Sequence, residues 1–133
     1  MAISSEAQLV WQKALRKLSE ATQMPPESFP GVVIVSSYFA MRHAAVAVLL
    51  QNDGKAPSAE TEIIARFGVV VGAEGAEHGR AFNRVFDLRN AEDYDAVATP
   101  ESEEAADACS AAKAFIAYCS QKFGFPLAAQ NPL

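Results

Sequence analysis

The segment from residue 99 to residue 126 constrains the fold most, because it carries a start signal, an apolar stripe and a stop signal for one long helix. Thr99 is the expected N-cap and Pro100 the first helical residue, and Glu101, Glu103 and Glu104 follow in the first turn. Gly124 and Pro126 are expected to end the helix. The apolar residues recur at helical spacing: Ala105, Ala108, Cys109, Ala112, Phe115, Ile116, Cys119 and Phe123. A helix with such a stripe needs other elements to cover it.

The N-terminal half predicts two more helices. The sequence Ser5-Glu6-Ala7-Gln8 has the spacing of a capping box, with Ser5 as N-cap of a helix that runs to about Ala21. A second helix is expected from about Val32 to Asn52, because its Ala-rich, helix-periodic part outweighs the strand-like start at residues 32–35. Its expected stripe is Val35, Phe39, Arg42, Val46 and Leu49, flanked by Val32, His43 and Leu50.

Turn residues separate two further helices in the second half. Ser58 is the expected N-cap of a helix that ends near Gly72, with Ile63, Ile64, Phe67, Val70 and Val71 on its apolar face. Another helix starts near Ala76, with Arg80, Asn83 and Arg84 on its outer side. The sum is an all-α, up-and-down bundle of four to five helices. We expect one domain over 1–133, with a core over about 5–124 and a loosely held tail over 125–133.

Composition narrows the classes of function. The net charge is −5 and no block of Lys or Arg exists, so a broad nucleic-acid footprint is absent, although a small site for a few phosphates is not excluded. No signal peptide is visible, and the longest apolar run, Ala44 to Leu50, is too short to span a bilayer. Cys109 and Cys119 on one helix are about 15 Å apart, too far for a disulfide. We therefore expect a reduced, cytoplasmic protein. We expect no metal or cofactor, because H-E-x-x-H and Cys-x-x-Cys motifs are both missing.

The candidate site begins where an apolar helix face ends in a cation. Phe82, Val85, Phe86 and Arg89 share one face in the segment FNRVFDLRNAEDYD, and the polar residues Asn90, Glu92, Asp93 and Tyr94 follow. This pattern allows a polar site at the mouth of the bundle or at a dimer seam. The alternative is an ion pair of Arg89 with Asp93 or another carboxylate, and spacing alone favours this second interpretation.

Arg42 and His43 present the same choice, because they interrupt an otherwise apolar helix. They are either a packed or interfacial pair, or they join Arg89 at one site.

Several motifs together resemble a known family. Tyr38 to Ala45 reads Y-F-A-M-x-H-A-A, L-L-x-x-x-G ends at Gly54, Phe67-Gly68 follows, and Leu88 to Tyr94 reads L-R-N-x-x-D-Y. With the last helix, these pieces are similar to the HEPN domains (higher eukaryotes and prokaryotes nucleotide-binding), in particular the small stand-alone prokaryotic branch. The resemblance covers roughly residues 7–123.

The resemblance implies a bundle of four or five helices that forms a homodimer. Many family members are metal-independent RNases, and several are toxins paired with a nucleotidyltransferase antitoxin. Their motif is an Arg, a polar residue, three more residues and a His, which carries over to Arg89, Asn90 and Tyr94, so that Tyr replaces His. Tyr, with a pKa of about 10, is a poor base near neutral pH, whereas His, with a pKa of about 6.5, is a suitable one.

Three functions therefore follow as hypotheses, in this order. The first is a HEPN-like dimer that binds a protein or a nucleotide as half of a two-gene module, with Arg42 and Asp93 as ligand contacts. The second is an RNase toxin in which Arg89 and Asn90 hold the phosphate and Tyr94 or His43 moves a proton. The third is a structural bundle with Arg89 in an ion pair. A nucleotidyltransferase-type protein and RNA or a nucleotide are the expected partners.

Overall fold

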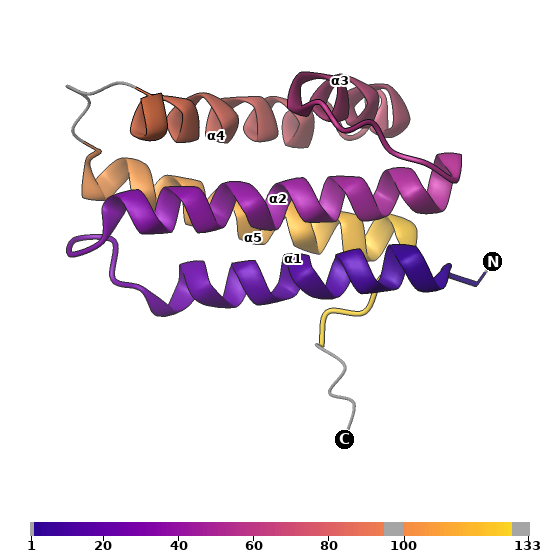
Figure 1. Cartoon of the computed structure of the whole chain (residues 1–133), viewed down its shortest axis with the longest axis horizontal. Helices are drawn as coiled ribbons and strands as arrows, with labels where there is room; N and C mark the ends of the chain where they lie inside the picture. Colours follow the sequence, from indigo (N-terminus) through magenta and orange to yellow (C-terminus); the bar gives the residue numbers. More distant parts are fainter. Residues whose placement is uncertain (1, 95–99, 129–133) are drawn as a thin grey trace.

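The structure, a computed structural model, describes residues 2–94 and 100–128, and of residues 92–94 the backbone alone. Five helices make up these parts, and they contain no strand: α1 (Ser5–Gln23), α2 (Pro30–Asp53), α3 (Glu60–Val71), α4 (Ala76–Tyr94) and α5 (Ser102–Phe123). Figure 1 shows α1, α2, α4 and α5 running along the long axis of the molecule, with α3 turned across one end of α4. The all-α bundle predicted from the sequence is confirmed.

Helix α2 is the centre of the bundle, because it packs against each of the other four helices. Its buried side chains lie on most of its circumference and include Val33, Ile34, Tyr38, Met41 and Val48. In the predicted stripe on α2, Leu49 is fully buried. Its other members, Val35, Phe39, Arg42 and Val46, lie on the side that α1, α3, α4 and α5 leave half-exposed.

Three predicted helix starts differ from the structure. Ser4, not Ser5, caps α1, and its Oγ atom accepts a hydrogen bond from the backbone N–H of Ala7 at 3.1 Å. Helix α3 follows Ala59 rather than Ser58 and has no side-chain cap, so Glu60 is its first residue. The cap of α5 is Glu101, which forms a reciprocal capping box with Glu104 and places the start after Pro100.

The predicted cap Thr99 lies outside the described residues. The predicted ends near Gly72 and at Gly124 are confirmed, with φ of 62° and 82° at these two residues, as is the start of α4 near Ala76.

The chain after α5 packs back onto α1, in contrast to the loosely held tail expected from residue 125. The ring of Phe125 is buried and stacks on Trp11 with centroids 4.6 Å apart. The indole N–H of Trp11 donates to the carbonyl oxygen of Pro126 at 2.6 Å, and the hydroxyl of Ser120 donates to the carbonyl of Phe125. The reason is that Trp11 offers both an apolar face and a donor that needs a partner when buried.

Helix α2 alone in the described residues is long and apolar enough to cross a bilayer by length and composition. Two thirds of that apolar segment, 67%, is buried inside the bundle, as in the core helix of a soluble protein.

Candidate functional site

Arg89 lies on the same face of α4 as the buried residues that precede it. Phe82 and Val85 are fully buried on that face, and Phe86 is partly buried one turn before Arg89. The Arg89 side chain therefore lies on the side of α4 that faces the bundle, and 15% of its surface is exposed. The sequence prediction that Arg89 shares the core-facing side of this helix is confirmed.

A single carboxylate joins Arg89 to Arg42. The Oε2 atom of Glu60 lies 3.2 Å from the NH1 atom of Arg89, and its Oε1 atom lies 3.2 Å from the Nε atom of Arg42. The three residues come from α4, α3 and α2, so three helices meet at one ionic cluster. The NH1 atom of Arg89 is also 3.5 Å from the Oδ1 atom of Asn90. Arg42, Arg89 and Asn90, which sequence reasoning had grouped as one candidate site, do lie together.

The guanidinium of Arg89 makes cation–π contacts with two aromatic rings. Its Cζ atom lies 5.3 Å from the ring centroid of Tyr38 and 5.5 Å from that of Phe39. Such cation–π contacts help to orient the guanidinium. Burial raises the pKa of Tyr38, and the neighbouring Glu60 carboxylate raises it further, so the phenol stays protonated at neutral pH. Tyr38 therefore acts in this cluster as a packed ring and a neutral hydroxyl.

His43 lies beside this cluster, toward α1. Its ring contacts Phe39, with centroids 6.1 Å apart. Burial lowers the pKa of His43 to about 4, and the positive charges of Arg42, Lys13, Lys17 and Arg16 contribute to the same shift. His43 is therefore neutral at pH 7, and as a base it is weaker than an ordinary imidazole.

Two of the predicted site residues lie outside the described side chains. Asp93 and Tyr94 belong to the last turn of α4 by their backbone, and nothing further is described for them. The ion pair of Arg89 with Asp93 therefore stays a prediction. The alternative, a pair with another carboxylate, is confirmed, and that carboxylate is Glu60.

Sequence reasoning missed the role of Glu60. It read the residue only as an acidic group in the first turn of α3, where a carboxylate suits the helix dipole. Glu60 and Arg89 are 29 residues apart, so no local spacing pairs them. One signal in the sequence could have identified it. Two arginines on apolar helix faces each need an anionic partner, and Glu60 lies between them in the chain.

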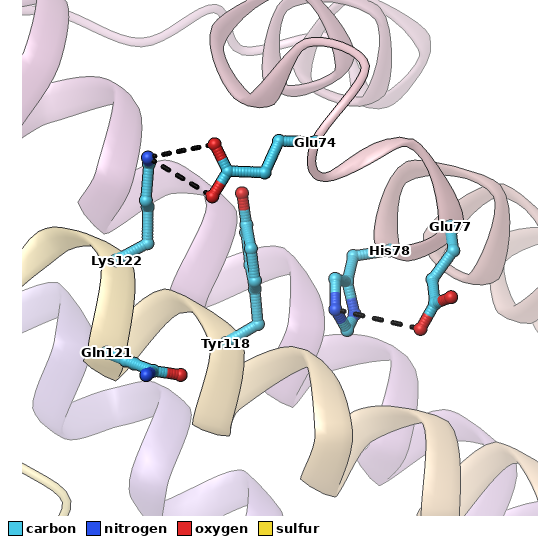
Figure 2. A pocket seen from close by; sticks show the side chains of 6 residues that line it. All are labelled: Glu74, Glu77, His78, Tyr118, Gln121 and Lys122. Atoms are coloured by element: carbon cyan, nitrogen blue, oxygen red, sulfur yellow. Dashed lines mark hydrogen bonds and ion pairs between the residues drawn. The ribbon is translucent and has the colours of Figure 1, made fainter.

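A second polar cluster lies at the start of α4, shown in Figure 2. A cavity of about 450 Å³ is lined by Glu74, Glu77, His78, Tyr118, Gln121 and Lys122. The ring of His78 stacks on Tyr118 with centroids 4.3 Å apart, and Lys122 pairs with Glu74 at 3.2 Å. The charged groups here are mostly exposed and satisfy one another. No three His, Cys, Asp or Glu side chains gather as metal ligands in the described parts of the chain.

Comparison with known proteins identifies the family. The family model described as "HEPN domain" matches residues 7–122, which is most of the chain. The chain belongs to the HEPN domain family. No curated protein and no solved structure matches it. The family assignment confirms the resemblance to HEPN domains. Arg89, which that resemblance matches to the Arg of the family motif, lies in the cluster with Glu60 and Arg42.

Proposed function

We propose that this HEPN protein is a homodimer that binds a phosphate-bearing ligand, a nucleotide or an RNA strand, between Arg42 and Arg89. The observation that carries the proposal is the convergence of these two guanidinium groups, from α2 and α4, on one anionic group. Arginine suits this task because its planar donors match the oxygens of a phosphate. Aromatic contacts hold Arg89 in place, so its charge is available without prior ordering.

In this proposal the ligand is held and not cleaved. RNA cleavage by the family route needs a group that takes or gives a proton near neutral pH. Tyr94 occupies the motif position of the histidine. His43, the other candidate, has a pKa lowered to about 4 and is a weak base. Both features support binding over catalysis.

The homodimer is supported by the uncovered side of α2. Val32 is 47% exposed, and Val35, Phe39 and Val46 are half-buried along the same stripe. This apolar stripe contains Arg42 and borders Arg89, so a second copy that covers it brings two copies of the site together. A cytoplasmic two-gene module with a nucleotidyltransferase-type protein belongs to the same proposal, as the family resemblance implies.

The test of function compares RNA cleavage and nucleotide binding in EDTA for the wild type, Arg89→Ala and Tyr94→His. We expect binding without cleavage in the wild type, loss of binding in Arg89→Ala, and cleavage gained in Tyr94→His. Cleavage by the wild type that disappears in Arg89→Ala would establish an RNase instead. Neither binding nor cleavage in any variant would leave a structural bundle.

The test of the dimer is light scattering coupled to size-exclusion chromatography at micromolar concentration. Val46→Glu places a charge in the stripe and should convert the dimer to a monomer. Val69→Glu is the matched control, because Val69 is 68% exposed on α3, away from the stripe. A wild type that elutes as a monomer would refute the dimer.

A further inference from the structure

Glu60 occupies the position that an anionic ligand would take. Each of its two carboxylate oxygens faces a different guanidinium, Oε1 facing Arg42 and Oε2 facing Arg89, both at 3.2 Å. The two non-bridging oxygens of a phosphate group have a similar separation and the same affinity for arginine. Moving the Glu60 carboxylate away would therefore open the position between the Arg42 and Arg89 guanidinium groups to another anion.

We propose that Glu60 is a built-in competitor for this site, and that a phosphate group binds by displacing its carboxylate. The inference rests on the proposed function and adds to it how the site is controlled. The protein on its own has the site closed by Glu60, and the ligand must outcompete a tethered anion. Its apparent affinity is reduced by the fraction of molecules in which Glu60 is in place.

The position of Glu60 in the chain allows this exchange. It is the first residue of α3, its side chain is 26% exposed, and the preceding residue, Ala59, has an extended backbone and makes no side-chain cap. A rotation of the side chain carries the carboxylate into water while it stays near the N-terminus of α3, where the helix dipole favours a negative charge. The displaced state is therefore not penalised by an unpaired buried anion.

The arginines stay in place when the carboxylate leaves. The guanidinium of Arg89 rests on the rings of Tyr38 and Phe39, and Tyr38 is fully buried. Arg42 lies on α2, which all the other helices hold. Arg89 is thus held by packing, whereas the Glu60 side chain stands at a helix start and is 26% exposed.

The experiment measures binding of two probes, fluorescein-labelled octauridylate and ATP, by anisotropy and calorimetry respectively. The variants are Glu60→Gln, which keeps the shape and removes the charge, and Glu62→Gln, an exposed carboxylate in the same first turn of α3. We expect Glu60→Gln to bind at least one of the probes about tenfold more tightly than the wild type. Glu62→Gln should stay within about twofold, since it removes the same charge from the same helix end. The gain should vanish in Glu60→Gln/Arg89→Ala.

The two probes separate the sources of the phosphate. A gain for octauridylate alone assigns the site to a nucleic-acid backbone, and a gain for ATP assigns it to free nucleotides. Unchanged or weaker binding by Glu60→Gln, beside wild-type binding that Arg89→Ala abolishes, overturns the competitor role and keeps the proposed function. No binding by any variant overturns both.

A second variant covers the case in which Glu60→Gln does not fold. Glu60→Asp keeps the charge at the helix start and shortens the reach by one methylene group. We expect a smaller gain in affinity from it, and affinity equal to or below that of the wild type would count against the proposal.

Discussion

The carboxylate of Glu60 lies 3.2 Å from the guanidinium of Arg89, and this contact ties the first residue of α3 to the last turns of α4. Both side chains are largely shielded from water, with 26% and 15% of their surface exposed. A pair in such a position matters for folding as well as for ligands, and the two roles are separable by experiment.

Arg89→Ala should lower the free energy of unfolding by about 1–3 kcal/mol, less than for a fully buried pair, because Glu60 keeps Arg42 as a partner. Urea denaturation gives the value. Arg66→Ala is the control: its ion pair with Asp53 at 2.8 Å is exposed, and we expect a loss below about 1 kcal/mol. Equal losses in the two variants would show that the cluster adds nothing beyond a surface ion pair.

Phe125→Ala should destabilise the protein by about 2–4 kcal/mol, because it removes a buried ring stacked on Trp11. Leu127→Ala, two residues on, removes a side chain that is 60% exposed and should change stability by less than about 0.5 kcal/mol. Thermal and chemical denaturation of the full chain measure both. A small effect at Phe125 would mean that the segment after α5 does not hold α1.

Two glycines should respond oppositely to alanine. A Cβ atom at Gly75 would meet the Cβ atom of Val71 at 2.5 Å and the hydroxyl of Tyr118 at 2.6 Å, so Gly75→Ala should cost about 1–3 kcal/mol. A Cβ atom at Gly68, inside α3, meets nothing within 4 Å. Gly68→Ala should therefore stabilise the protein by about 0.5–1 kcal/mol. Melting temperatures that move in the same direction for both variants would contradict the close packing of Gly75 against Val71 and Tyr118.

Acid should weaken the fold through His43. Its pKa is lowered to about 4 in the folded protein, against about 6.5 in an unfolded chain. Between these values the unfolded chain binds the extra proton, so stability falls as the pH drops from 6.5 to 4. The loss is on the order of 1–2 kcal/mol, because solvent screens this half-buried group. Unfolding curves at several pH values should show a flatter profile in His43→Gln, and a profile unchanged from the wild type would refute the assignment.

The sequence predicted the helices well because each carried its own stripe and its own turn residues. Its caps were misplaced by one or two residues. Ser4 and Ser5 are equally suited to cap α1, whereas α3 begins after Ala59 without the side-chain cap that Ser58 would offer. The stripe of α2 left the orientation of that helix open for another reason. A central helix is apolar on every side, so periodicity cannot say which side its own chain leaves open.

The candidate site was predictable only in part. Arg89 and Arg42 stood out because charge is costly on an apolar face. Glu60 did not stand out, because its tertiary partners lie on two other helices and a first-turn glutamate is ordinary. The pKa of His43 is lowered first by burial and then by Arg42, and the cations of α1 add to the shift because α1 packs against α2.

The hydrogen bond between Trp11 and Pro126 joins residues 115 positions apart. During synthesis at 5–20 residues per second, Trp11 emerges roughly 6 to 23 seconds before Pro126 is made. The hairpin of α1 and α2 needs no later residue for its own contacts and can form early in that interval. Throughout the interval the indole lacks its stacking ring and its acceptor, and both are supplied only when Phe125 and Pro126 have been made.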